Sequence, residues 1–375
     1  MNNQPPTVIV GMSGGVDSSV CALLLKQQGY RVIGLFMKNW EEKDENGVCT
    51  SVKDYEDVVS VCNQLEIPYY SVNFVEEYRD HVFSYFIDEL KRGYTPNPDI
   101  LCNREIKFQA FLSKAKSLGA NYIAMGHYCR IGGSTESPTL LKGVDGGKDQ
   151  SYFLYTLKEK ILRQVLFPIG HLEKHEVRKI AEEHGLSTAK KKDSTGICFI
   201  GERNFTEFLS PYIPYQEGPF LTLNRKKVGT HVGMAYYTIG QRKGIGIGGE
   251  GEAWFVVGKC AEQNIVYVEQ GTNHPALYAQ TLTASDITWV SSTPPCFPIE
   301  CTAKIRYRQK DQDCIIEKEE NNILHIRFLQ PQRAITPRQS IVFYQNDICL
   351  GGAMIIQAGL SLHEEGKELL STITI

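Results

Sequence analysis

The first third of the chain alternates short apolar runs with segments whose apolar residues recur every three or four positions. Apolar runs of this length predict buried strands, and the helical spacing predicts helices that cover them. The predicted strands are 7–12, 31–37, 68–73 and 121–126, and the predicted helices are 18–28, 53–65, 75–92 and 104–118. This alternation is typical of an α/β domain, a parallel sheet with helices on both faces.

The pattern changes after residue 127. A polar, glycine-rich stretch over 131–150 predicts a loop or hairpin, and helical spacing returns at 158–165 and 173–184 before ending near 210. Short alternating runs then predict strands at 226–238, 254–259, 264–268, 281–289, 299–307, 313–316, 323–329 and 340–357. We therefore expect an α/β domain over 1–210, a small β-rich central domain over 211–275 and a C-terminal β-barrel over 276–375.

Composition adds little to this picture. At 375 residues, 42% hydrophobic and 22% charged, the chain is typical of globular proteins, and no run approaches the length of a membrane helix. The first six residues hold no basic region or apolar core of a signal, so we expect a cytoplasmic protein. The net charge of −3 neither requires nor forbids a nucleic-acid partner, although basic clusters at 190–192, 225–227, 242–243 and 304–310 are compatible with a phosphate-binding face.

Eleven cysteines are scattered through the chain without a Cys-x-x-Cys pair. An odd count without that spacing argues against a disulfide framework or a four-cysteine zinc site. We expect no metal site built from protein groups alone.

The segment Ser13-Gly14-Gly15-Val16-Asp17-Ser18 joins the first predicted strand to the first predicted helix. Glycines at such a turn let the backbone approach an anion, and the amides and dipole of the helix favour negative charge. The loop lacks the lysine of a kinase-type P-loop and the third glycine of a dinucleotide fingerprint. It resembles the pyrophosphate loop of ATP pyrophosphatases, with Asp17 facing the Mg²⁺ that accompanies ATP.

The strand ends supply further candidates for the same site. In a parallel sheet the ligand lies beyond the carboxyl ends of the strands. Met12, Met37 and Gly126-His127 all stand at predicted strand ends, so they should converge beside the loop. Met37 and Gly126 are therefore candidates for the adenine and ribose walls.

Two cysteines stand in irregular loops. Cys102 follows Pro96 and Pro98 and precedes a predicted helix, a setting that lowers the pKa of a thiol, with Asp99 near enough to act as acid or base. Cys198 lies in a glycine-marked loop beside the lysine run. ATP can activate a carbonyl oxygen as its adenylate, persulfide sulfur on one cysteine can replace that oxygen, and the second thiol can resolve the disulfide or free the sulfide.

The motifs GMSGGVDSS, NPDILCNREIKF, MGHY, GGKDQSYFLY, STGICFIGERNF and AKIRYRQ together resemble the bacterial tRNA-specific 2-thiouridylases. The resemblance implies an adenine-nucleotide hydrolase-like domain, a small central domain and a C-terminal β-barrel. It implies adenylation of the C2 carbonyl of wobble uridine 34 in the Lys, Glu and Gln tRNAs. Sulfur transfer from a cysteine persulfide then yields 2-thiouridine, AMP and pyrophosphate. The reaction consumes ATP, requires Mg²⁺ and takes its sulfur from an external donor.

The resemblance also assigns residues. It implies that Cys198 carries the persulfide, that Cys102 is the nucleophile or resolving thiol, and that Asp99 is the acid or base. The residues expected to bind ATP are Gly11, Met12, Ser13, Gly14, Gly15, Val16, Asp17, Ser18, Met37 and Gly126. Those expected to contact the target base or tRNA are Asn97, Pro98, Asp99, His127, Lys148, Asp149, Gln150, Arg306, Tyr307 and Gln339.

Partners and alternatives complete the expectations. We expect the protein to bind tRNA and to receive sulfur from a relay protein or a cysteine desulfurase. We expect it to be a monomer that does not bind a membrane. One alternative is an amide-forming ATP pyrophosphatase such as an NAD, GMP or lysidine synthetase, which has no use for Cys102 and Cys198. The other is a non-catalytic RNA-binding protein with a nucleotide-sensing domain, which the β-rich C-terminal part alone does not exclude.

Overall fold

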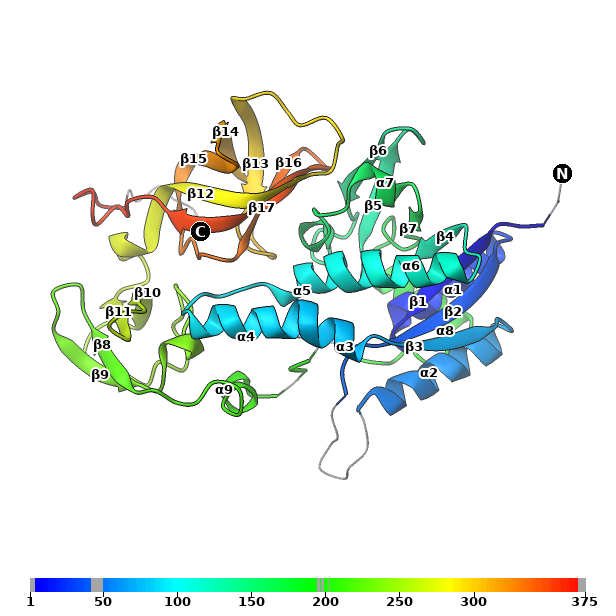
Figure 1. Cartoon of the computed structure of the whole chain (residues 1–375), viewed down its shortest axis with the longest axis horizontal. Coiled ribbons are helices and arrows are strands. Elements are labelled where there is room, and N and C mark those ends of the chain that lie inside the picture. The colour runs from blue at the N-terminus through cyan, green and yellow to red at the C-terminus, as the bar shows by residue number, and fades with distance from the viewer. Residues whose placement is uncertain (1–3, 42–49, 194–195, 197–198, 202, 370–375) are drawn as a thin grey trace.

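The computed structural model describes residues 4–41, 50–193, 196, 199–201 and 203–369 (Figure 1). Its N-terminal part holds a five-stranded, all-parallel sheet in the order β3-β2-β1-β4-β7. The strands are β1 Thr7–Met12, β2 Arg31–Lys38, β3 Tyr69–Asn73, β4 Tyr122–Ala124 and β7 Val165–Leu166. The chain order reverses between β1 and β4, so a ligand site is expected where these two strands end.

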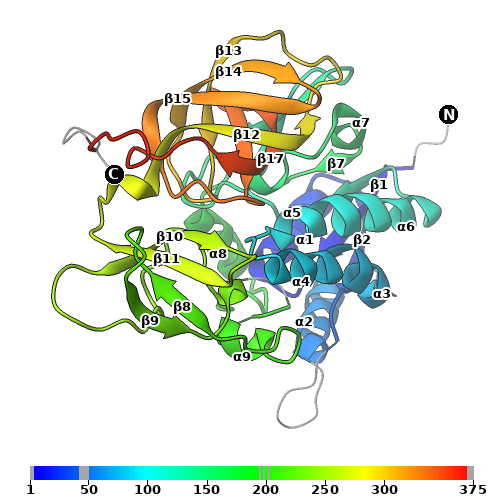
Figure 2. The same ribbon diagram turned by 60° about the vertical axis from the view of Figure 1, so that its left-hand side comes forward.

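Helices cover both faces of this sheet, as Figures 1 and 2 show. Val8 and Val10 of β1 join the core formed with α1 Val16–Gln27, α2 Thr50–Gln64 and α8 Lys174–Glu183. Ile9, which points to the opposite face, joins the core formed with α4 Ser84–Lys91 and α6 Phe111–Ser117. The predicted α/β class of the N-terminal domain is confirmed.

Two long helices run through π-helical turns. One comprises α3 Val75–Tyr78, η1 Arg79–Phe83 and α4, and the other comprises α5 Pro98–Leu101, η2 Cys102–Ala110 and α6. The second begins six residues earlier than predicted, because the Asn97 side chain accepts a hydrogen bond from the amide of Asp99 (3.2 Å) and Pro98 suits the first helical position. The prediction that Cys102 lies at a helix N-terminus is therefore wrong, and Asp99 occupies the first turn instead.

Three further predictions needed correction. The helix expected over 158–165 is α7 Glu159–Leu162, and the next residues form the edge strand β7, whose pairing with β4 overrides local propensity. The strand expected over 226–238 is β9 Lys227–His231 followed, after Gly233, by a 3-10 turn. The run 340–357 is two strands, β16 Ser340–Gln345 and β17 Ile348–Ala358, separated by a turn with Asn346 at φ 54°.

The rest of the chain is β-rich. After the short α9 Phe205–Leu209 comes a four-stranded sheet, β10-β11-β8-β9, made of β8 Gly218–Leu221, β9, β10 Trp254–Cys260 and β11 Ile265–Gln270. The C-terminal sheet runs β12-β15-β14-β13-β16-β17 and closes through a β12–β17 pairing. Its other strands are β12 Tyr278–Trp289, β13 Ile299–Lys304, β14 Gln312–Glu320 and β15 Ile323–Arg333. This closed six-stranded barrel confirms the predicted fold of the C-terminal part.

A hairpin links the barrel to the N-terminal domain. Strands β5 Cys129–Gly133 and β6 Pro138–Lys142 form the hairpin expected in the 131–150 stretch. Strand β6 pairs with β17 of the barrel, with Leu140 directly opposite Cys349. Residues from the first 150 positions thus extend the C-terminal sheet, and the expected boundaries at 210 and 275 stay predictions.

Among the described residues, no helix is long and apolar enough to cross a membrane.

Candidate active site

The glycine-rich loop after β1 has the shape of an anion cradle. Gly14 has φ +75°, and a Cβ there would lie 2.5 Å from the backbone oxygen of Asp54 on α2, so only glycine fits. The hydroxyl oxygens of Ser13 and Ser18 lie 3.2 Å apart across the loop. Gly15 is the N-cap of α1, and no side chain caps that helix, which leaves its first amides available to a ligand.

Strand ends gather beside this loop. A Cβ on Gly11 would lie 3.4 Å from the terminal methyl carbon of Met37, which brings the ends of β1 and β2 together. A Cβ on Gly126, beyond β4, would lie 3.1 Å from the amide nitrogen of Ser18 in α1. The convergence predicted for Met37 and Gly126 is therefore present in the structure. Their contacts with adenosine remain predictions.

Asp17 is held by two groups that the sequence analysis did not single out. The Lys174 ammonium, from the start of α8, donates to both carboxylate oxygens at 2.7 and 2.8 Å. The Tyr128 hydroxyl donates to one of them at 2.7 Å. Burial, together with the charge of Asp17, raises the pKa of Tyr128, so the phenol stays protonated. A cation and a hydroxyl thus flank the carboxylate that was expected to face Mg²⁺.

A second carboxylate extends the same network. Asp193 accepts hydrogen bonds from Lys148 (2.7 Å) and Arg178 (2.7 Å) and forms an ion pair with Lys174 (2.9 Å). Burial alone would raise the pKa of Asp193, but the hydrogen bonds and charges of Lys148 and Lys174 outweigh it and lower the pKa to about 2. Asp193 is therefore ionised at neutral pH, and Lys174 is shared between it and the pyrophosphate loop.

The helix that carries Cys102 faces the end of β4. Cys102 is buried, with 5% of its surface exposed. Burial raises the pKa of Asp99, partly offset by the charge of Lys107. The Lys107 nitrogen lies 3.4 Å from Nε2 of the buried His127, and burial together with that charge holds the pKa of His127 well below 6.5. The structure thus brings Lys107, on the helix that carries Asp99 and Cys102, to His127 beyond β4. Cys198 lies outside the described residues.

One lysine of the run upstream of Cys198 binds the neighbouring helix. The Lys191 ammonium donates to Asp54 (2.7 Å) and Asp57 (2.6 Å) of α2. This lysine ties its segment to the helix that also walls the pyrophosphate loop.

All three parts of the chain meet at the loop before Asn97. The Gln339 side chain, from the barrel, donates to the backbone oxygen of Thr95 at 2.7 Å. The Thr95 hydroxyl lies 3.3 Å from that of Thr238 in the central part. The loop that leads into the expected base-contacting residues Asn97 and Pro98 is thus held from two sides.

Arg306 and Tyr307 also lie at this junction. One terminal nitrogen of Arg306 donates to the backbone oxygens of Ile239 (3.0 Å) and Ala334 (2.9 Å), so the guanidinium joins the central part to the barrel. The ring of Tyr307 packs on that of Phe153, with centroids 4.3 Å apart. Contacts of Arg306, Tyr307 and Gln339 with tRNA remain predictions.

The side chains of residues 148–150, expected to contact tRNA, bind mainly other groups of the protein. Lys148 reaches Asp193, as described above. Asp149 is buried and accepts from the amides of Gly143 and Ser151, each at 3.1 Å. Gln150 pairs with the backbone of Tyr128 through its amide (2.9 Å) and its side-chain oxygen (3.0 Å). These residues fix the chain beyond β4, and their contact with tRNA stays a prediction.

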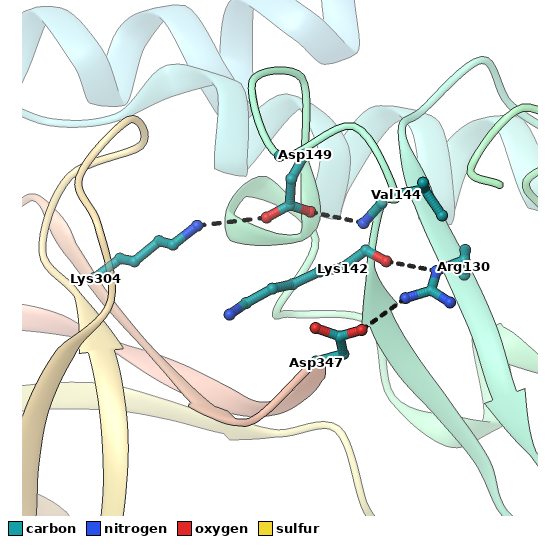
Figure 3. A pocket seen from close by; sticks show the side chains of 8 residues that line it. Arg130, Lys142, Val144, Asp149, Lys304 and Asp347 are labelled. Atoms are coloured by element: carbon teal, nitrogen blue, oxygen red, sulfur yellow. Dashed lines mark hydrogen bonds and ion pairs between the residues drawn. The ribbon is translucent and has the colours of Figure 1, made fainter. Parts of the chain in front are cut away.

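A cavity of about 510 Å³ lies between the hairpin and the barrel (Figure 3). Each of two cations in it faces a carboxylate: Arg130 lies 2.9 Å from Asp347, and Lys304 lies 3.5 Å from Asp149. The lining residues are Arg130, Lys142, Gly143, Val144, Gly146, Asp149, Lys304 and Asp347. One of them, Asp149, is among the residues expected to contact tRNA, and none belongs to the pyrophosphate loop or the Cys102 helix.

A parallel sheet with a pyrophosphate loop after its first strand, and a cysteine-bearing helix at the same strand ends, defines a nucleotide-activating enzyme domain. Residues 6–202 match the family described as the tRNA methyl transferase HUP domain. Residues 206–270 match its PRC-barrel domain, and 279–355 match the aminomethyltransferase β-barrel domain.

Two curated relatives specify the family. The chain is 62% identical over 370 residues to the tRNA-specific 2-thiouridylase MnmA of Protochlamydia amoebophila, covering 98% of each chain. It is 60% identical over 358 residues to the protein of the same name from Staphylococcus epidermidis, covering 95% of this chain and 96% of that one. The chain therefore belongs to the tRNA-specific 2-thiouridylase family.

Among solved structures, a 4-thiouridine synthetase in complex with RNA and bound ATP is similar at a TM-score of 0.34 and 16% identity, covering 56% of this chain and 50% of that one. A likeness this slight says nothing of function.

Proposed function

We propose that this chain makes 2-thiouridine at wobble position 34 of the Lys, Glu and Gln tRNAs. Membership in the 2-thiouridylase family makes it a tRNA sulfurtransferase that uses ATP. The observation that carries the finer proposal is that Lys107, on the helix bearing Asp99 and Cys102, lies 3.4 Å from His127 beyond β4, and that the neighbouring Gly126 abuts the start of α1 behind the pyrophosphate loop. An adenylated base bound there would be within reach of a thiol.

The first step joins the base to AMP. The C2 oxygen of the uridine attacks the α-phosphorus of ATP, the bond to the β-phosphate breaks, and pyrophosphate leaves. The proton on N3 passes to a base, for which the buried carboxyl of Asp99 is the candidate. The uridine must leave its stack to enter, at a cost of a few kcal/mol that is smallest in a single-stranded loop.

The second step replaces oxygen by sulfur. Cys198 would carry the persulfide, and its terminal sulfur reaches C2 either directly or as sulfide that Cys102 has freed. In both orders the Cys102 thiolate attacks Sγ of Cys198 and breaks the S–S bond of the persulfide, the C2–O bond breaks, AMP leaves, and a disulfide between Cys102 and Cys198 remains. Two external thiols, or one dithiol, then supply two electrons, are themselves oxidised to a disulfide, and restore both cysteines. The persulfide sulfur comes from a relay protein or a cysteine desulfurase.

The residues around the loop fit ATP with Mg²⁺. Gly14 and Gly15 leave room for phosphate oxygens, the uncapped start of α1 supplies amides, and Lys174 supplies a cation at 2.7 Å from Asp17. Mg²⁺ would screen the pyrophosphate charge, and Asp17 is the carboxylate positioned to face it.

The test is reconstitution with unmodified tRNA-Glu transcript, MgATP, cysteine and a cysteine desulfurase. Nucleosides are analysed by mass spectrometry, and the variants are Cys102→Ser and Cys198→Ser. Cys296→Ser is the matched control, because Cys296 is exposed and lies in the C-terminal part. We expect 2-thiouridine from the native chain and the control and none from the other two.

Other outcomes separate the alternatives. Thiouridine production by either of the two active-site variants would refute the two-thiol scheme. An amide-forming ATP pyrophosphatase would stay active with serine at both positions. A tRNA-binding protein without catalysis would release no pyrophosphate.

A further inference from the structure

His127 carries an unused hydrogen-bonding atom in the middle of the candidate site. Its Nε2 lies 3.4 Å from the Lys107 ammonium, and its Nδ1 is buried with no partner among the described residues. An ammonium group can only donate, so Nε2 must be the acceptor of this contact. Since burial and the Lys107 charge hold the pKa of His127 well below 6.5, the ring is neutral at pH 7 and its single proton sits on Nδ1.

The position of the Nδ1–H of His127 indicates where its hydrogen-bond acceptor comes from. Gly126 abuts the first turn of α1, where a Cβ would lie 3.1 Å from the amide nitrogen of Ser18. The next side chain, His127, packs against the ring of Phe108 (5.8 Å), which belongs to the Cys102 helix, and against that of Phe167 (6.0 Å). His127 therefore stands between the nucleotide loop and that helix. A buried donor without a partner is costly, which indicates that a ligand supplies the acceptor.

The π-helix explains why Lys107 can reach this place. In η2 the hydrogen bonds run between residues five apart, so Cys102 and Lys107 share a face. In an α-helix the same two residues would point about 140° apart. The Lys107 ammonium lies 3.4 Å from Nε2 of His127, and its charge also partly offsets the effect of burial, which raises the pKa of Asp99.

We propose that Lys107 is a positioning residue of the thiolation reaction: it fixes His127 in the tautomer that donates from Nδ1 to the C2 oxygen of the target base. This inference rests on the proposed function for the identity of that oxygen. Negative charge develops on the oxygen as N3 loses its proton and again as the C2–O bond breaks. A fixed donor there stabilises both stages.

The first arm of the test needs neither tRNA nor activity. Long-range ¹H–¹⁵N spectra of protein labelled at histidine report which ring nitrogen carries the proton, and His127→Gln assigns the signal. We expect a neutral Nδ1–H ring in the native chain and loss of that preference in Lys107→Met. Lys114→Met, at an exposed lysine farther along the same long helix, is the control and should leave the tautomer unchanged. An Nε2–H tautomer in the native chain would overturn the inference.

The second arm is kinetic. Lys107→Met should lower kcat for thiolation by about a hundredfold, in line with loss of one fixed donor, with little change in KM for ATP. Lys107→Arg, which keeps a donor and the positive charge, should recover part of the lost kcat. An unchanged kcat in a folded Lys107→Met variant would overturn the inference. An Nδ1–H tautomer in a native chain that forms no thiouridine would instead refute the proposed function.

Discussion

Asp193→Asn tests whether the ion network beside the pyrophosphate loop stabilises the N-terminal domain. In the folded protein the pKa of Asp193 falls from its ordinary 3.8 to about 2. Since a change of 1 in pKa is worth about 1.36 kcal/mol, the ionised carboxylate gains on the order of 2 kcal/mol on folding. Only 28% of its side chain is exposed, so solvent screens this interaction less than it does on an open surface. We expect Asp193→Asn to lower the free energy of unfolding by about 2 kcal/mol at pH 7.

The stability difference between the native chain and Asp193→Asn should decrease at low pH. A carboxylate whose pKa is lowered by folding stabilises the protein above its unfolded pKa, and the contribution is lost as pH falls through its folded value. The difference between native chain and variant should therefore be the same at pH 7 and pH 5. It should shrink as pH falls from 3.8 towards 2.

Urea denaturation measures this difference. Trp254→Phe and Trp289→Phe in the background leave Trp40 as the fluorescent reporter of the N-terminal domain, because the sequence holds three tryptophans. Asp347→Asn is the matched control: Asp347 has 65% of its side chain exposed and pairs with Arg130 at the surface, so it should change stability by less than about 1 kcal/mol. An equal effect of the two variants, or a difference that is as large at about pH 2 as at pH 5, would refute the reasoning.

Three further variants test other parts of the site. Gly14→Ala puts a Cβ 2.5 Å from the Asp54 carbonyl oxygen at φ +75°, so calorimetry should show at least about tenfold weaker ATP binding. Gln339→Ala leaves the Thr95 oxygen without its donor, which should speed hydrogen exchange in that loop by roughly five- to thirtyfold. Burial lowers the pKa of His127, so folding stability should fall as pH drops below 6.5. His127→Gln should flatten the slope of urea-measured stability between pH 6.5 and about 5.

The sequence predicted the elements whose signals are local and strong. Apolar runs located β1 and β2, glycine at positions 14 and 15 marked the turn, and parallel strand order placed Met37 and Gly126 at one edge. The Cys102 helix starts six residues before the predicted start, because Asn97 and Pro98 together are a helix-start signal although they stand in a proline-rich stretch typical of a loop.

The residues that complete the site carry no such signal. Lys174 begins an ordinary amphipathic helix and Tyr128 follows a strand end, and nothing local indicates that both reach Asp17. Lys107 depends on a π-helical segment, which has no recognised sequence pattern and changes which residues share a face. The contacts of Lys174 and Tyr128 with Asp17 span more than a hundred positions, and that of Lys107 with His127 links a helix to a strand end, so spacing along the chain encodes neither.

The pairing of β6 with β17 has a consequence for how the chain is made. The hairpin leaves the ribosome early, yet its partner strand begins at Ile348, roughly 200 residues later. At typical synthesis rates that interval is roughly 10 to 40 s, during which one edge of β6 has no partner strand. The pyrophosphate loop and the Cys102 helix can assemble in that time, while the barrel closes only when the last strand emerges. The nascent chain therefore depends on β6 staying unpaired with other chains, and the charge of Lys142 and the ring of Pro138 on that strand oppose such pairing.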